Sequence, residues 1–201
     1  MIDGVIKYSI EHLSDNAPKF QNYTELESVR SDLFALGLIG EYNGIGYGNI
    51  SLRDKETHSF FITATQTGDK AELTQKFYTY VEDYNFSTFT IFSKGHYKPS
   101  SEALSHAVIY SLNENIKGVI HIHCKALWKF MIEQNYMYTE AEYGTQQMIG
   151  EIQQLYKEHD PLTNNMFVMR GHEDGIICFG TTITQAKKKL FHLIKDCLEQ
   201  T

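Results

Sequence analysis

The sequence predicts a three-layer α/β/α fold, in which helices flank a central, mainly antiparallel sheet. Two observations predict it: short segments of strand character recur along the chain, and amphipathic segments with helical spacing lie before, between and after them. The chain has 201 residues, of which 42% are hydrophobic, so it is long enough to bury a core. We therefore expect a single domain over residues 1–201.

The first half of the chain is expected to contain one helix followed by strands. Leucine and valine recur at helical spacing over residues 24–39, with Thr24 as the N-cap and Gly40 as the stop signal. The segments "NISLRD" and "SFFITAT" are typical of strands, and the short polar connection between them predicts a hairpin. Aromatic residues are abundant over residues 78–92, where polar interruptions predict two further strands.

The second half is expected to combine helices with buried strands. A helix is predicted over residues 101–112, and the apolar "GVIHIH" follows it as a buried strand. The remaining elements are "KALWKFMIEQ" and "TQQMIGEIQQLYKE" as helices, "MFVMR" and "GIICFG" as strands, and "TITQAKKKLFHLIKDCLEQ" as a closing amphipathic helix.

Charge and cysteine content argue against several classes of protein. The net charge of −7, from 25 acidic and 18 basic residues, disfavours general attraction to nucleic acid or to an anionic membrane. The three cysteines are widely spaced and form no C-x-x-C pair, which disfavours a disulfide framework and a cysteine-zinc site. No run of about 18 apolar residues occurs, and the amino terminus lacks the pattern of a signal peptide. We expect a cytoplasmic protein.

Two histidines in the strand "GVIHIH" indicate a metal site or a pair of core histidines. Alternate residues of a strand face the same side, so His121 and His123 point one way and Cys124 the other. Taken alone, the pair favours neither interpretation. Two other residues favour a metal site: Glu102 begins the preceding helix, and His172 lies in a turn-like stretch before a strand. Three histidines near a carboxylate are the composition expected of a catalytic zinc.

Three short stretches have the composition of an anion pocket. Glycines lead to Asn49 in "GIGYGNIS", "TATQTGD" supplies Thr67 and Gly68, and "PSSE" supplies Ser100 and Ser101 at a helix start. Glycine lets backbone N–H groups approach a ligand closely, hydroxyls donate hydrogen bonds, and a helix N-terminus favours negative charge. The glycine cluster is not a dinucleotide fingerprint, because a strand follows it and not a helix.

Taken in order, these motifs resemble the class II aldolase/adducin-head family, which includes fuculose-phosphate aldolase. The resemblance covers nearly the whole chain: "GIGYGNIS", "FFITATQTG", "SSE", "HIH" and "GHEDGIICFG". It implies a carbon–carbon lyase that acts on a small sugar phosphate or hydroxy-carbonyl compound through an enediolate. It also implies a homotetramer with the active site at a subunit interface.

The resemblance further implies roles for individual residues. His121, His123 and His172 would bind Zn²⁺, and Glu102 would be the acid/base, for which we expect a raised pKa. The phosphate would be held by Asn49, Thr67, Gly68, Ser100 and Ser101. Glu142 and Tyr143 lie about where the family places a residue that protonates the leaving alkoxide from a neighbouring chain.

Two departures from the family pattern affect these expectations. "GHEDG" places Glu173 and Asp174 between His172 and the next glycine, and added carboxylates near a metal can alter the charge preference for substrate. "TATQTG" leaves open whether Thr65 or Thr67 faces the ligand.

Several alternatives stay open at this point. Family members that dehydrate methylthioribulose phosphate or epimerise pentulose phosphate use the same metal site, and imidazole also suits divalent ions other than zinc. An adducin-like interaction module is disfavoured, because all three histidines and Glu102 are present. His106, on the same predicted helix face as Glu102, is either a neighbour of the metal site or an ordinary packed histidine.

Overall fold

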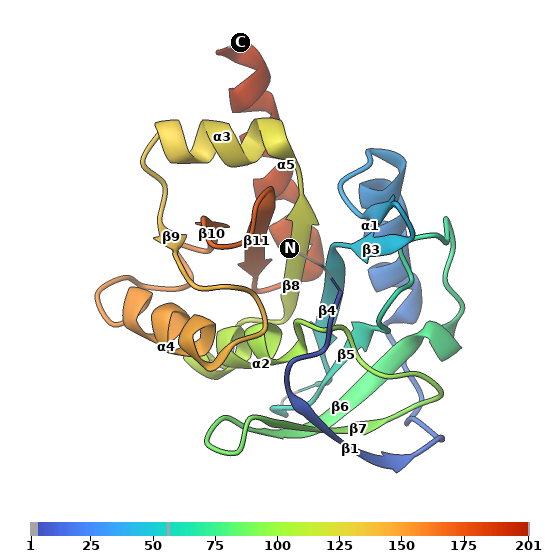
Figure 1. Ribbon diagram of the computed structural model, residues 1–201. Helices are drawn as coiled ribbons and strands as arrows, with labels where there is room; N and C mark the ends of the chain where they lie inside the picture. The colour runs from blue at the N-terminus through green and yellow to red at the C-terminus, as the bar shows by residue number, and fades with distance from the viewer. Residues whose placement is uncertain (1–3, 56, 201) are drawn as a thin grey trace.

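The computed structural model describes residues 4–55 and 57–200 and confirms the predicted arrangement of helices on both faces of a sheet (Figure 1). The strand order of the main sheet is β1-β7-β6-β5-β4-β8-β11-β10-β9. The strands of this sheet are β1 (Ser9–Ser14), β4 (Asn49–Arg53), β5 (Phe60–Thr63), β6 (Tyr78–Asn85), β7 (Thr90–Lys94), β8 (Gly118–His123), β9 (Tyr138–Thr139), β10 (Met166–Met169) and β11 (Gly175–Gly180).

The helices lie in two layers, one on each face of the sheet. On one face α1 (Tyr23–Ala35), α3 (Lys125–Glu133) and α5 (Ile183–Glu199) pack against the side of β8 that carries Ile120 and Ile122. On the other face α2 (Ala103–Leu112) and α4 (Gln146–Leu155) pack against the side that carries Val119. Each layer closes its own apolar cluster, as expected for a sheet whose strands are buried on both faces.

The pairing of the sheet is mainly antiparallel, as predicted. The expected hairpin forms between β4 and β5, and the two further strands that were predicted, β6 and β7, also pair with each other. β8 lies between β4 and β11 and is antiparallel to both. Parallel pairs occur between β1 and β7 and between β9 and β10. The centre of the sheet thus places β8, with its two histidines, among buried neighbours.

The sequence analysis missed β1, β9 and a small separate hairpin of β2 (Gly40–Tyr42) and β3 (Ile45–Tyr47). The residues of β1 are mostly exposed, so they lack the alternation of apolar side chains that identifies a half-buried strand. β1 is the edge strand and is held instead by backbone pairing along β7.

Helix α1 ends at Ala35, four residues before the predicted end. The stop signal is Gly37 and not Gly40. Gly37 has a φ of 68°, which favours glycine, and Leu38 N–H donates to the carbonyl of Leu33, as in a Schellman motif. A short 3₁₀ turn, η1 (Gln75–Phe77), precedes β6. Across the described ranges, no helix is long and apolar enough to cross a bilayer.

Candidate metal centre and the pocket beside it

The two strand histidines face the α2 side of the sheet, together with residues of neighbouring strands. The register pairs His121 with Asn49 of β4, and residues directly opposite in an antiparallel pair point to the same side. His121 is completely buried, whereas His123 is partly exposed. Cys124 packs with the opposite cluster, on the other side of the strand as predicted. The alternation of β8 therefore determines which side chains face the site.

The third histidine, His172, lies in the turn between β10 and β11 and reaches the other two. The Nε2 atom of His123 is 3.0 Å from Nε2 of His121 and 3.0 Å from Nε2 of His172. One ring nitrogen from each of the three residues lies within 4.8 Å of the other two. The structure thus brings together the three histidines that the sequence analysis proposed as metal ligands.

The surroundings of His121 favour a metal ligand over a hydrogen-bonded core histidine. Its Nδ1 is 3.2 Å from the carbonyl of Ile176 and must donate there, because a carbonyl only accepts. Nε2 is then the nitrogen that faces the other imidazoles and the Glu102 carboxylate, and once deprotonated it would offer its lone pair to a metal. A backbone carbonyl that fixes the tautomer of a histidine is a common feature of metal sites.

Glu102 brings a carboxylate to the same point. It is the N-cap residue of α2 and is buried, with Oε1 2.9 Å from His121 Nε2 and 3.7 Å from His172 Nε2. Edges of about 3.3 Å join the ligand atoms of a tetrahedral zinc, given Zn–N distances near 2.05 Å. The donor set of three imidazoles and one carboxylate oxygen, in an arrangement of nearly this size, fits a divalent metal.

The expectation of a raised pKa for Glu102 is wrong in this structure. Burial alone raises the pKa, but the charge of His121, its hydrogen bond with Glu102 and the charge of His172 outweigh it, so the pKa falls to about 2. Burial, helped by the two other histidines, lowers the pKa of His123 well below its usual range. Glu102 is therefore ionised and His123 neutral near pH 7, which are the forms that bind a metal.

A small polar pocket lies directly beside Glu102. Its walls include the residues expected to hold a phosphate: Asn49, Thr67, Gly68, Ser100 and Ser101. Both Thr65 and Thr67 lie along it, but the Thr67 hydroxyl donates to the carbonyl of Ala64 at 3.0 Å. The cavity that remains is about 20 Å³. The residues predicted to bind a phosphate therefore line the same pocket, and its cavity is small.

The sequence analysis missed a buried arginine that holds one wall of this pocket. Arg30 of α1 is completely buried, and its guanidinium donates to the carbonyls of Thr67, Lys70 and Ala71. These bonds fix the loop that carries Thr67 and Gly68. A signal was present, because position 30 shares the buried face of α1 with the leucines and valine of the predicted helix.

Tyr143 and Glu142 lie differently with respect to the histidines. Tyr143 is completely buried, and its ring packs on that of His172, with 4.7 Å between ring centroids in the same chain. Its hydroxyl accepts the N–H of Val5 at 3.2 Å. Glu142 is exposed and forms an ion pair of 2.6 Å with Lys7, whose amine also donates to the carbonyl of Tyr143. The segment ahead of β1 therefore packs against this side of the site.

His106 is a buried neighbour of the site on α2. Its Nδ1 bonds the hydroxyl of Ser51 at 2.7 Å, and that hydroxyl also bonds Tyr110 at 2.7 Å. Burial lowers the pKa of His106 to about 3, with opposing effects of Glu102 and His121. His106 is thus a neutral histidine in a polar cluster beneath Glu102, and it is not among the three converging rings.

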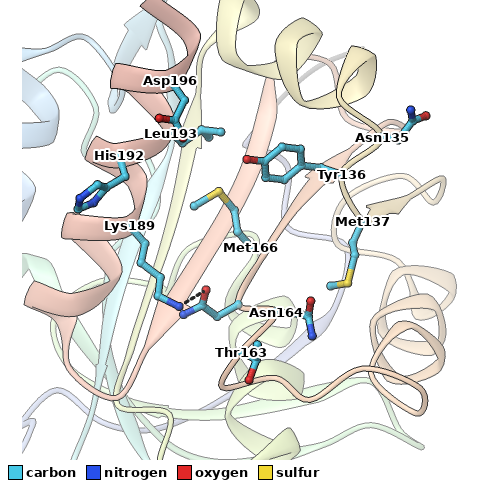
Figure 2. Close-up of a pocket in the computed structure, with 11 residues that line it drawn as sticks. Asn135, Tyr136, Met137, Thr163, Asn164, Met166, Lys189, His192, Leu193 and Asp196 are labelled. Atoms are coloured by element: carbon cyan, nitrogen blue, oxygen red, sulfur yellow. Dashed lines mark hydrogen bonds between the residues drawn. The ribbon is translucent and has the colours of Figure 1, made fainter. Parts of the chain in front are cut away.

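Two larger hollows differ in their relation to the histidines. One, of about 560 Å³, adjoins His123 and is lined by residues that include Tyr47, Lys125, Glu173 and Asp174. The Lys125 amine and the Glu173 carboxylate form an ion pair of 3.2 Å at the surface. The other, of about 460 Å³, lies between α5 and the loops before β9 and β10, and includes none of the three histidines (Figure 2).

Comparison with known proteins gives a family match and a fold match. Residues 40–201 match the family model described as "Class II Aldolase and Adducin N-terminal domain". No curated protein matches the sequence.

Solved structures are similar in fold at low sequence identity. L-fuculose 1-phosphate aldolase superposes with a TM-score of 0.66 at 18% identity, covering 90% of this chain and 85% of that chain. L-fuculose-1-phosphate aldolase from Thermus thermophilus gives 0.60 at 20% identity, covering 88% and 91%. Sugar-phosphate aldolase from Thermotoga maritima gives 0.64 at 17% identity, covering 85% and 89%. These likenesses show a shared fold.

Proposed function

The chain belongs to the class II aldolase and adducin N-terminal domain family, and we propose that it is a divalent-metal-dependent aldolase acting on a small hydroxy-carbonyl compound or sugar phosphate. The observation that carries the proposal is the convergence of His121, His123 and His172 with the Glu102 carboxylate. In this proposal the three imidazoles hold the metal, with zinc as the expected ion.

The reaction requires charge stabilisation and a positioned base. Cleavage of a carbon–carbon bond beside a hydroxyl leaves an enediolate on the ketone fragment, and the bound metal supplies the Lewis acid that stabilises its charge. Glu102, ionised and buried, is the group proposed to move a proton at the carbon next to the carbonyl. In the synthetic direction the same base removes that proton, and the enediolate attacks an aldehyde.

The leaving alkoxide of the cleavage direction needs a proton, and Tyr143 is the proposed donor. In its bond with Val5 the hydroxyl is the acceptor, which directs its proton to another partner. Its ring packs on His172 within the same chain, so this donor needs no neighbouring subunit. Glu142 is exposed and is the alternative donor for a site completed by a second chain.

The two spaces on either side of the histidines suit the two fragments. The polar pocket with Asn49, Ser100 and Ser101 is proposed for the end of the ketone fragment that lies away from the metal. The larger hollow beside His123, with Glu173 and Asp174, is proposed for the aldehyde. We also propose that the chain assembles as a homotetramer and works in the reducing cytoplasm.

A same-family epimerase or dehydratase is the second candidate. YgbL from Klebsiella pneumoniae, described as an aldolase, epimerase or decarboxylase, has a similar fold. Its TM-score is 0.65 at 19% identity, covering 88% of this chain and 86% of that chain. The deciding experiment is to assay the zinc-loaded chain on aldol, dehydration and epimerisation substrates in parallel. Turnover confined to dehydration or epimerisation would reject the aldolase proposal. A chain that binds no metal and turns over none of them would favour an interaction module.

A further inference from the structure

The N-terminal segment, residues 4–8 ahead of β1, contacts two parts of the candidate site. The Val5 N–H donates to the Tyr143 hydroxyl oxygen at 3.2 Å, and the Tyr8 hydroxyl donates to the carbonyl of Ser100 at 2.6 Å. Tyr8 and Ser100 are both buried. The segment is thus joined to the turn that carries Tyr143 and to the start of α2.

Between these two contacts, Lys7 holds the turn by three interactions. Its amine forms an ion pair of 2.6 Å with Glu142, donates to the carbonyl of Tyr143 at 3.1 Å, and lies 3.9 Å from the centroid of the Tyr143 ring. The ring face attracts an ammonium group, whose three donors can also serve the carboxylate and the carbonyl. Lys7 therefore constrains both the backbone and the ring of Tyr143.

The turn that Lys7 contacts packs on two groups of the site. The ring of Tyr143 lies 4.7 Å from the ring of His172, measured between centroids. Gly144 has a φ of 64°, and a Cβ added to it would lie 3.2 Å from the carbonyl oxygen of Ser101, which leaves little room for a side chain. A shift of this turn would move the Tyr143 hydroxyl relative to His172 and to the start of α2.

The contacts of Lys7 are local and lie outside the core. Its side chain is 24% exposed, so replacing it opens no cavity in the core, and a partly exposed ion pair contributes little to global stability. The N-terminal segment also lies outside residues 40–201, the region that the family model matches, so the match assigns it no role. A loss of activity in a stable Lys7 variant would therefore report on the position of Tyr143.

We propose that Lys7 is a positioning residue for Tyr143, and that the N-terminal segment completes the candidate site from within the same chain. Lys7 and the Val5 N–H set the place of the Tyr143 hydroxyl beside His172, while Tyr8 joins the start of α2 to the same segment. The inference rests on the proposed function for proton donation by Tyr143, but the hold of Lys7 on the turn is measurable without turnover.

The first test measures amide hydrogen exchange of the full chain by mass spectrometry, comparing wild type with Lys7→Met. Methionine fills a similar space but removes the ammonium group. In the folded chain the N–H groups of Glu140 and Ala141, which precede the turn, donate to Glu151. We expect peptides that cover residues 140–144 to exchange at least about threefold faster in Lys7→Met. The thermal midpoint should stay within about 2 °C of that of the wild type, because the core is intact.

Two further variants separate the role of this cation from general loosening. Lys7→Arg keeps a cation that can lie over the ring and pair with a carboxylate, so exchange should return to near the wild-type rate. Lys19→Met, at an exposed lysine, is the matched control and should exchange like the wild type. Equal exchange in the wild type and Lys7→Met would overturn the inference.

The second test measures the condensation of glycolaldehyde with dihydroxyacetone or its phosphate by the zinc-loaded chain. We expect Lys7→Met to lower kcat about tenfold with KM unchanged within about twofold, because the proton donor is displaced and the binding groups are not. In the Tyr143→Phe background the same change should have little further effect, because the hydroxyl that Lys7 positions is gone.

A kcat of Lys7→Met near that of the wild type, or an equal loss of kcat in both backgrounds, would overturn the positioning role. A wild type that condenses neither donor counts against the proposed aldolase, while the exchange test still decides whether Lys7 holds the turn.

Discussion

The Glu102 carboxylate lies 2.9 Å from Nε2 of His121, both of them buried, although one begins a helix and the other lies within a strand. Both side chains are removed from water, unlike most carboxylates and imidazoles. Glu102 is held ionised by the charges of the histidines and by its hydrogen bond with His121, and Nδ1 of His121 donates to the carbonyl of Ile176. This pair links the start of α2 to β8, so the proposed proton-transfer group and one of the proposed metal ligands are held by regular elements of the fold.

Removing one ligand is expected to abolish stoichiometric metal binding. His172→Ala leaves two imidazoles and should weaken zinc affinity by at least about 100-fold, since removal of even a supporting partner costs about 10- to 100-fold. The measurement is metal content after dialysis, together with zinc affinity by competition with a chelator. His159→Ala, at an exposed position, is the control and should keep full metal content. Equal metal content in the two variants would contradict the centre.

Glu102→Gln is expected to keep the metal and lose activity. The amide has nearly the same shape but no longer acts as a base, so kcat should fall by about 10²- to 10⁴-fold. Metal content should stay near that of the wild type, because the three imidazoles remain. Glu133→Gln, at an exposed position, serves as the control. Retention of more than about a tenth of wild-type kcat would rule out Glu102 as the acid/base.

Tyr143→Phe is expected to separate proton donation from packing. The phenylalanine ring retains the contact with His172, so stability should change by no more than about 1 kcal/mol, while loss of the hydroxyl should lower kcat about 10- to 100-fold. KM should change little. Glu142→Gln is the informative comparison: a larger loss of kcat there would assign proton donation to Glu142.

Arg30→Met is expected to loosen the pocket loop. The substitution leaves carbonyls of Thr67, Lys70 and Ala71 without their buried donor, which should cost about 3 kcal/mol in the free energy of unfolding. KM should rise more than kcat falls, because the loop carries binding groups. Urea denaturation and steady-state kinetics measure the two effects. Lys157→Met, on the surface, is the control, and an equally small effect of both variants would contradict the role of Arg30.

The stability of the protein should depend on pH through His106. Burial lowers its pKa to about 3, against about 6.5 in the unfolded chain. Between these values the unfolded chain binds a proton that the folded chain excludes, so the free energy of unfolding falls as pH decreases below about 6.5. The slope from this one group is at most about 1.4 kcal/mol per pH unit, and the loss is complete near the folded pKa.

The comparison that isolates this effect is His106→Asn, whose amide stands where Nδ1 bonds Ser51. Urea denaturation at pH 7 and pH 5 should show a loss about 2 kcal/mol smaller in the variant than in the wild type. His58→Asn, at an exposed histidine, should behave like the wild type. Parallel pH dependence in all three proteins would show that His106 does not carry the effect.

Local patterns predicted much of the fold. Strand-forming residues identified β4 and β5, an apolar run identified the buried strand β8, and helical spacing identified α5, whose buried face repeats at the period of the helix. The exposed edge strand β1 and the short β9 escaped prediction. Their pairing depends on backbone groups of distant strands and leaves little trace in their own side chains.

The candidate site was likewise predicted only in part from the sequence. The sequence by itself determined that His121 and His123 share one face of a strand, because strand geometry depends only on neighbouring residues. Only the tertiary structure decided that His172 and Glu102 join them, and that Arg30 fixes the loop of the pocket beside Glu102. It also reversed the expected pKa shift of Glu102, because desolvation and the charges of neighbouring groups sum through space and not along the chain.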